Sequence, residues 1–338
     1  MLKRLLTFAT HRIYSLPIIV LMPHSRCNCR CVMCDIWKAN NNKKELTIDE
    51  LSKHVATFRS FGVREIVFSG GEALMHSNFW TLCNLLKDEK VKLTLLSTGL
   101  LLEKNAESII QYIDNVIISV DGSRTIHDRI RNIPGAYEKI TIGIKALKKI
   151  KPSLKVRARC VLQRGNFADF INTVRSSQSI GFDQISFLAA DVSTSAFNHV
   201  SALSEERVSE IALSKTETIE FEKIVTNSFV DLKAEYATKF IGETPKKILK
   251  IVQYFKALNG MANHPPAICN APWVSAVIES NGDVMPCFFH KPYGNIHEYE
   301  FRSIINSKKA IAFRKNLDTT HDPVCNKCVC SLKLGLTQ

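Results

Sequence analysis

Four of the chain's cysteines fall within residues 27–34, close to the N-terminus. Cys27, Cys31 and Cys34 form a C-x3-C-x2-C pattern on a loop that directly follows an apolar stretch. Three thiolates spaced in this way can hold three irons of a [4Fe–4S] cluster and leave the fourth iron open. An open coordination position is typical of a catalytic rather than a structural metal site. A zinc site that takes His24 as its fourth ligand and a group of buried structural thiols are the alternative interpretations.

A second group of cysteines lies towards the C-terminus. Cys269, Gly282 and Cys287 form a C-x12-G-x4-C pattern, and Cys325 and Cys328 form a C-x2-C pair. Four thiolates from two separated segments can ligate a second cluster completely. The Asn-Gly-Asp turn between the first two cysteines predicts a β-hairpin that brings them together. A zinc ribbon with four cysteine ligands is the alternative, because C-x2-C is also a zinc spacing.

The chain has 11 cysteines, and four of them have no firm role in these two sites. Cys29 lies between the expected ligands of the first group in the sequence, and we expect that it does not ligate metal. Cys330 can replace Cys328 as a ligand or remain free. Cys83 and Cys160 lie in helix and strand patterns, and we expect them to be small buried apolar residues.

The elements that position the first cysteine loop alternate between short apolar runs and amphipathic stretches. This pattern predicts strands at 16–22, 64–69, 92–97, 115–120, 155–162 and 184–188, and helices at 47–61, 78–87, from about 103, 137–150 and 167–180. Six β/α alternations predict an α/β fold with a parallel sheet, a partial (β/α)6 TIM-like barrel with fewer strands than the eight of a closed barrel. Functional groups in such sheets gather at the C-terminal ends of the strands.

Changes in composition along the chain divide it into four parts. We expect an N-terminal helical segment at 1–15, the β/α core at 16–200, a charged helical bridge at 201–260 and a cysteine-rich C-terminal extension at 261–338. The bridge contains no cysteine, whereas the extension holds five. The extension is therefore the expected iron–sulfur domain.

Composition excludes several classes of protein. With 338 residues, 45% hydrophobic and 23% charged, the chain has the make-up of a globular protein and not of a fibre or a disulfide-rich miniprotein. No apolar run approaches the roughly 20 residues of a membrane span, so we expect no transmembrane segment. Without an export signal, we expect a reducing cytoplasm, where clustered cysteines bind metal more often than they form disulfides.

The net charge of +13 favours an acidic partner, such as an anionic small-molecule substrate. The densest basic stretch, residues 145–159, falls mostly on a helix that we expect to be solvent-exposed. No module combines aromatic and basic residues, so we expect no nucleic-acid partner.

The C-x3-C-x2-C pattern behind the first strand resembles that of the radical S-adenosylmethionine (SAM) superfamily. The family usually has an aromatic residue before the last cysteine, where this chain has Met33. Gly70, Gly71 and Glu72 follow the second strand and resemble the family's GGE motif, which the resemblance places around the SAM amino group. Glycine lets the backbone approach a ligand closely, and a carboxylate can accept hydrogen bonds from an ammonium group.

Further residues at strand ends fit the same resemblance. Ser97, in Ser-Thr-Gly, ends the third strand, and Ser119 and Asp121, in Ser-Val-Asp-Gly, end the fourth. By analogy these groups face the SAM ribose or carboxylate, although Asp-Gly is also ordinary turn chemistry. Arg159 on the fifth strand is a candidate partner of the SAM carboxylate, because a guanidinium can bind a carboxylate bidentately. Asn166 matches the asparagine that, in this family, often caps the helix after the fifth strand.

The resemblance implies a cofactor set. The SAM-binding [4Fe–4S] cluster would bind SAM at its open iron, and an electron from a donor such as flavodoxin or ferredoxin would cleave SAM to a 5′-deoxyadenosyl radical. The C-terminal cysteines resemble the SPASM/Twitch extension of these enzymes. Five cysteines there, rather than the roughly seven of a full SPASM, favour the Twitch form with one auxiliary [4Fe–4S] cluster.

Three functional hypotheses follow from the sequence. The first is a radical SAM enzyme that oxidises, decarboxylates or rearranges a small polar substrate of the sugar, nucleoside or cyclitol type. Residues 185–193 resemble the corresponding stretch of radical SAM enzymes that act on sugar nucleosides. The second is a maturase that modifies a ribosomally made peptide, which the short segment before the first strand disfavours. The third is a non-enzymatic zinc or iron–sulfur nucleic-acid binder, which leaves the GGE motif unexplained. The sequence indicates no acid or base for the substrate.

Overall fold

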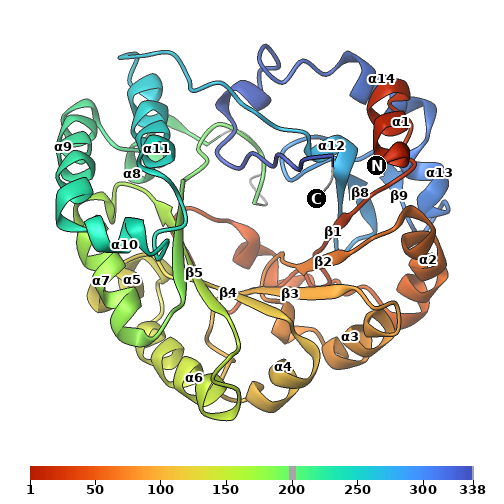
Figure 1. The fold of residues 1–338 in the computed structure, drawn as a ribbon, viewed down its shortest axis with the longest axis horizontal. Coiled ribbons are helices and arrows are strands. Elements are labelled where there is room, and N and C mark those ends of the chain that lie inside the picture. The colour runs from red at the N-terminus through yellow and green to blue at the C-terminus, as the bar shows by residue number, and fades with distance from the viewer. Residues whose placement is uncertain (198–202, 337–338) are drawn as a thin grey trace.

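One curved sheet organises the molecule. The computed structural model describes residues 1–197 and 203–336 (Figure 1). Its nine-stranded sheet has the order β6-β5-β4-β3-β2-β1-β7-β8-β9. The strands are β1 (Ile18–Leu21), β2 (Glu65–Phe68), β3 (Lys92–Ser97), β4 (Asn115–Ser119), β5 (Val156–Leu162), β6 (Gln184–Ala189), β7 (Ser275–Ile278), β8 (Asp283–Met285) and β9 (Gly294–Asn295).

Strands β1 to β6 pair in parallel in chain order, with helices on the outer side of the curve in Figure 1. β6 pairs with β5 and β1 with β2 and β7, so the described sheet stays open instead of closing into a ring. The predicted partial (β/α)6 barrel is therefore confirmed. Because all six strands run in one direction, their C-terminal ends meet at one rim, from which the cysteine loop emerges after β1.

The helices are α1 (Leu2–Thr10), α2 (Ile48–Phe61), α3 (Phe79–Lys87), α4 (Ala106–Tyr112), α5 (Arg124–Arg131), α6 (Ala136–Ile150), α7 (Phe170–Ile180), α8 (Glu205–Ile211), α9 (Lys215–Asp231), α10 (Lys233–Ala237), α11 (Pro245–Leu258), α12 (Ala271–Val274), α13 (Phe301–Ile305) and α14 (Lys308–Asn316). Helix α2 illustrates how the local sequence determines where a helix begins and ends. Thr47 and Glu50 form a reciprocal capping box, and Gly62 ends the helix at a φ of +69°. The helix predicted at 47–61 is thus confirmed.

Burial alternates along the strands and separates two faces of the sheet. In β5, Val156, Ala158 and Cys160 are fully buried, whereas Arg157 is exposed and Arg159 is half-buried. The buried row packs on the helices, and the other row lines the inner side of the curve. Polar groups for chemistry are therefore presented on the inner row.

The C-terminal extension continues the main sheet. β7 pairs in parallel with β1, and β8 returns antiparallel to β7 through the turn at Asn281-Gly282-Asp283, as the hairpin prediction required. Gly282 has a φ of +85°, which suits glycine. The strand that leads into the first cysteine loop is consequently flanked by β2 on one side and by the extension on the other.

Two further observations concern the rest of the chain. The bridge is helical where it is described, from α8 to α11, while its expected junction with the core at residues 200 and 201 lies outside the described residues. No helix in the described ranges is long and apolar enough to span a membrane.

Candidate iron–sulfur and cofactor site

The loop after β1 is anchored on both sides of its first cysteine. Asn40 accepts a hydrogen bond from the backbone N–H of Cys27 at 3.0 Å and donates one to its carbonyl at 2.9 Å. His24 Nδ1 lies 3.0 Å from a carboxylate oxygen of Glu45. Burial lowers the pKa of His24 to about 4, so its ring is neutral. Among the described residues, His24 belongs to no trio of ligand atoms within 4.8 Å of one another, so the zinc interpretation that used it as a fourth ligand receives no support.

The thiols of this loop come together. Cys29 is buried, and its interactions with the Cys27 and Cys31 thiols, together with burial, raise its pKa. A hydrogen bond from Cys29 lowers the pKa of Cys31 to about 7, and the nearby Arg131 guanidinium acts in the same direction. Burial raises the pKa of Cys34 to about 12. Cys31 is therefore the thiol most readily converted to the thiolate that ligates metal.

The distances between possible metal-ligating atoms can be compared with those that a single ion needs. Among the described residues, only His290, Asp322 and Cys325 form a trio whose ligand atoms all lie within 4.8 Å of one another. A tetrahedral zinc ion with Zn–S bonds of about 2.3 Å needs sulfur atoms about 3.8 Å apart. The first cysteine group does not meet this criterion for a single ion among the described residues.

The GGE loop after β2 packs directly on the cysteine loop. A Cβ atom on Gly71 would lie 2.0 Å from the carbonyl oxygen of Arg26, and the backbone N–H of Glu72 donates to this same oxygen at 2.9 Å. Gly70 has a φ of +104°, and a Cβ there would lie 3.0 Å from Met22. Only glycines allow this approach, so the structure brings the two predicted motifs into contact.

Glu72 is fully buried and holds two strand ends together. Its Oε2 accepts hydrogen bonds from Ser97 Oγ at 2.9 Å and from Thr98 N at 2.7 Å, and its Oε1 accepts one from Leu74 N at 3.1 Å. Burial raises the pKa of Glu72. The Thr98 hydroxyl can donate either to Glu72 or to Asn28 Oδ1, because it carries one hydrogen. When it donates to Asn28, the carboxylate keeps one acceptor position for an ammonium group.

Ser119 and Arg159 form a second group on the inner row. They are register partners on β4 and β5, and Arg159 is paired in turn with Ser186 on β6. Arg159 Nε donates to Ser186 Oγ at 3.2 Å. Its charge also acts on the Cys330 thiol of the extension. A cationic group therefore lies between the core strands and the second cysteine group.

Asp121 is engaged by neighbouring residues of the core. Its carboxylate is fully buried and forms an ion pair with Arg131 of α5 at 2.6 Å, while its other oxygen accepts a hydrogen bond from Val161 N at 2.9 Å. Asn166 Nδ2 donates to the carbonyl of Asp121 and so ties the ends of β4 and β5 together. The sequence prediction did not include Arg131, since no motif singles it out.

The C-terminal cysteines also converge, as the fit of a second cluster requires. Cys269 precedes α12, Cys287 follows β8, and the last three lie at or after the short 3-10 helix at Cys325–Lys327. Burial raises the pKa of Cys287 to about 11, with Cys269 and Cys330 acting in the same direction. Asn270 closes the site through hydrogen bonds to the backbone of residues 332 and 334. The five thiols of the extension thus act on one another electrostatically, and a single cluster needs four of them.

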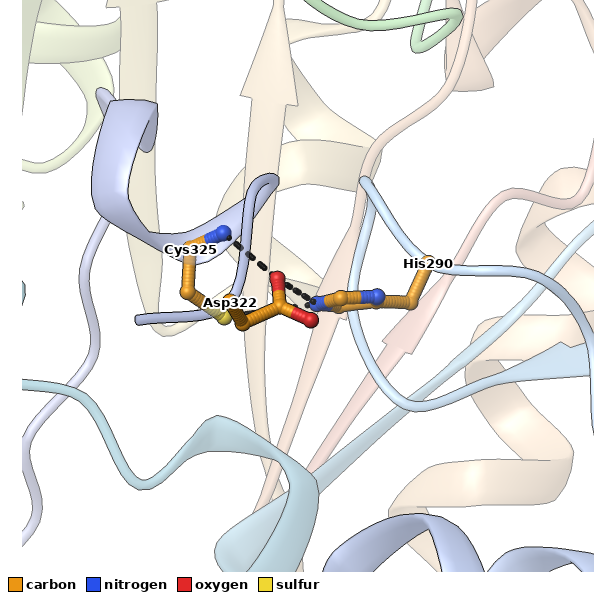
Figure 2. A group of neighbouring side chains, drawn as sticks. All are labelled: His290, Asp322 and Cys325. Carbon is orange, nitrogen blue, oxygen red and sulfur yellow. Dashed lines mark hydrogen bonds and ion pairs between the residues drawn. The ribbon is translucent and has the colours of Figure 1, made fainter. Parts of the chain in front are cut away.

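His290, Asp322 and Cys325 meet at the edge of this second group (Figure 2). Asp322 Oδ1 accepts hydrogen bonds from the backbone N–H groups of Val324 and Cys325, each at 2.9 Å, and so shapes the turn that carries the cysteine. His290 Nε2 lies 3.3 Å from Cys325 Sγ. The sequence prediction missed His290, although its position three residues after Cys287 is a usable signal.

Comparisons with known proteins agree with these sites. The family model described as the radical SAM superfamily matches residues 21–177. The model of the SPASM iron-sulfur cluster-binding domain matches residues 269–329. The two matches include all seven of the cysteines predicted as ligands.

Curated relatives are enzymes named for small-molecule chemistry. A probable GTP 3′,8-cyclase of Methanococcus maripaludis is 35% identical over 129 residues, which are 37% of this chain and 40% of the relative. The match thus spans less than half of that protein. An AdoMet-dependent heme synthase of Methanosarcina barkeri is 24% identical over 91% of this chain and 86% of its own length.

Solved structures share the fold over almost the whole chain. SuiB of Streptococcus suis bound to its precursor peptide SuiA superposes with a TM-score of 0.67 and 16% identity, over 98% of this chain and 75% of SuiB. The structure titled anSMEcpe with bound AdoMet gives a TM-score of 0.65 and 18% identity, over 88% and 82% of the two chains. At these identities the likeness concerns the fold alone.

Proposed function

The chain belongs to the radical SAM superfamily and carries a SPASM extension, and we propose that Cys27, Cys31 and Cys34 hold the [4Fe–4S] cluster at which SAM binds. The observation that carries this assignment is the contact between the two motif loops, where Gly71 lies against the Arg26 carbonyl. The backbone N–H of Glu72 donates to the carbonyl of Arg26, the residue before Cys27, which supports a site built from both loops. A radical SAM iron–sulfur enzyme needs these two groups next to each other.

The residues around the cluster would bind and orient SAM. Glu72 would accept a hydrogen bond from the ammonium group at its free acceptor position, and Ser97 would hold that carboxylate in place. Ser119 and Arg159 would face the ribose and carboxylate ends, since they lie side by side on the inner row. When bound, the cluster and SAM together supply reductive cleavage to a 5′-deoxyadenosyl radical, which removes a hydrogen atom from the substrate.

We further propose that the substrate is a small polar, anionic molecule of the sugar, nucleoside or cyclitol type, which is oxidised, decarboxylated or rearranged. The net charge of +13 supports an anionic partner. The relatives' names also support a small-molecule substrate, because GTP is a small polyanion and heme is a small molecule. Peptide modification is the second candidate, and it rests on the fold likeness to SuiB.

The extension would hold one auxiliary cluster through Cys269, Cys287, Cys325 and Cys328. Its support is the convergence of these thiols around one place, with Cys330 as the extra group. The electron donor would be a small redox protein such as flavodoxin or ferredoxin.

The experiment is SAM cleavage by anaerobically purified and reconstituted protein with dithionite as reductant. We expect 5′-deoxyadenosine to form, and its rate to rise with one of a set of nucleotides, sugar nucleotides and carboxylated porphyrins. Deuterium transfer from the labelled molecule into 5′-deoxyadenosine would identify the substrate. Stimulation by peptides alone would favour the second candidate, and no cleavage under any condition would contradict both.

A further inference from the structure

A buried ion pair lies against the first cysteine loop. Asp121 comes from the Ser-Val-Asp-Gly sequence, whereas its partner Arg131 belongs to none of the predicted motifs. Arg131, the last residue of α5, is only 6% exposed, and its partner Asp121 is 0% exposed. Arg131 Nη2 lies 2.6 Å from Asp121 Oδ2, and Arg131 Nη1 lies 3.5 Å from Cys31 Sγ. One guanidinium therefore joins a carboxylate on one side to a predicted cluster ligand on the other.

The backbone fixes this arrangement. The N–H of Arg30 donates to the Arg131 carbonyl at 3.0 Å, and the N–H of Val32 donates to the Ile130 carbonyl at 3.3 Å. These two hydrogen bonds flank Cys31 and hold the cysteine loop on the end of α5. Asp121 is held in turn by Val161 N, so the carboxylate cannot follow a movement of the loop freely.

The Arg131–Asp121 ion pair changes the electrostatic potential at the Cys31 sulfur beside it. Reduction adds one negative charge to a cluster and its thiolates, and a positive, donating guanidinium favours that charge. A buried position strengthens the effect, because little water screens it. Asp121 opposes the effect by compensating the charge of Arg131.

We propose that Arg131 and Asp121 are positioning residues that set the reduction potential of the cluster held by Cys31, with Arg131 raising it and Asp121 limiting the rise. This proposal rests on the proposed function, because it takes Cys31 as a cluster ligand. It also gives Asp121 a role other than contact with SAM.

The test is a redox titration of the reconstituted full-length protein without SAM, with dithionite as titrant and electron paramagnetic resonance as readout. One electron reduces [4Fe–4S]²⁺ to [4Fe–4S]⁺, and no bond is made or broken. The signal of this cluster is identified by its change when SAM is added. Asp121→Asn leaves the positive charge uncompensated, and the double variant Arg131→Met/Asp121→Asn removes both charges and the N–H···S contact.

The two variants should shift the potential in opposite directions. We expect the ratio of reduced to oxidised cluster at a fixed potential to rise about tenfold in Asp121→Asn and to fall about tenfold in the double variant, as for one hydrogen bond to a charged group. A tenfold change corresponds to 59 mV for a one-electron couple. Arg124→Met is the matched control, because it removes an exposed arginine of the same helix that is paired with Glu138. It should leave the potential unchanged.

Three results would overturn the proposal. One is an unchanged potential in both variants at full iron content. Another is weaker SAM binding by Asp121→Asn with no change in the SAM-free potential, which would make Asp121 a SAM ligand. The third is loss of the cluster from both variants but not from Arg124→Met, which would reduce the pair to holding the loop. Failure of the unmodified protein to load the cluster would instead contradict the proposed function.

Discussion

The contact between Gly71 and the Arg26 carbonyl leaves no space for even a methyl group. A Gly71→Ala variant must therefore push the cysteine loop away from the GGE loop. We expect a loss of stability of about 1–3 kcal/mol, as for other overpacked sites, together with weaker cluster loading. Iron content after reconstitution is the measurement.

Gly135→Ala is the matched control for this variant. Gly135 has a φ of +74° and open space around its Cα, so an alanine there costs roughly 1–2 kcal/mol through backbone strain alone. It is the N-cap residue of α6. If both variants lost stability to a similar degree and loaded iron equally, the close contact would have no role in the site.

Glu72 is the residue where substitution should act on SAM most directly. Glu72→Gln keeps the size of the side chain but removes its charge and turns one acceptor into a donor. We expect the dissociation constant of SAM to rise tenfold or more, because one hydrogen bond to a charged group is lost. Isothermal titration under anaerobic conditions measures this constant.

Glu65→Gln provides the comparison, because Glu65 lies on β2, the strand that precedes the GGE loop. Glu65 accepts a hydrogen bond from Thr94 at 2.6 Å and lies at the opposite end of β2. This variant should bind SAM as the unmodified protein does. Equal SAM affinity in Glu72→Gln and Glu65→Gln would remove Glu72 from the SAM site.

At the scale of elements, the bridge between His24 and Glu45 closes the base of the cysteine loop. The pKa of His24 is about 4 in the folded protein because of burial, against an ordinary value of 6.5. The unfolded chain therefore takes up this proton first as the pH falls. Stability should decrease from about pH 6.5 down to about pH 4, and it should be insensitive to His24 above that window.

Denaturant unfolding of the protein and of His24→Gln between pH 4 and pH 8 measures this effect. The variant should lose less stability than the unmodified protein across pH 6.5 to 4, because glutamine does not titrate. Identical pH profiles would show that His24 is not held neutral by burial.

The sequence predicted the parallel strands and most of the helices because apolar alternation and caps are local signals, as the capping box at Thr47 illustrates. Helix α5 was not predicted. Its sequence, Arg-Thr-Ile-His-Asp-Arg-Ile-Arg, is mostly polar, and its buried face includes His127 and Arg131. Hydrophobic periodicity cannot identify a face made of paired polar groups. The role of Asp121 depends on this helix and could not be derived without it.

The pairing of β7 with β1 was missed for another reason. The two strands are separated by more than 250 residues, and parallel pairing leaves no turn motif in the sequence. The hairpin between β7 and β8, in contrast, has a local Asn-Gly signal. Likewise, the cysteine spacings indicated both groups. The contact between His290 and Cys325, 35 residues apart in the sequence, emerges only from the folded chain.

At the scale of the whole molecule, the core and the extension share one continuous sheet. We nevertheless expect that the auxiliary cluster can be removed without loss of the first cluster. Replacing Cys269 and Cys287 with alanine should remove about four irons, those of the auxiliary cluster. SAM cleavage should persist, since the first group is untouched. Loss of SAM cleavage with the first cluster still loaded would show that the auxiliary site is required for that step.

The choice between Cys328 and Cys330 can be made with the same assay. We expect Cys328→Ala to lose iron and Cys330→Ala to retain it, because Cys330 is the extra thiol and is exposed. The reverse result would exchange their roles.

The most direct test of the account compares iron content and 5′-deoxyadenosine formation in three reconstituted proteins. The unmodified chain should hold about eight irons and cleave SAM, and the Cys27→Ala/Cys31→Ala/Cys34→Ala variant should hold about four and form no 5′-deoxyadenosine. Cys29→Ala, the control within the same loop, should behave as the unmodified protein does. SAM cleavage by the triple variant, or an unmodified protein that binds only zinc and leaves SAM intact, would contradict the central claim.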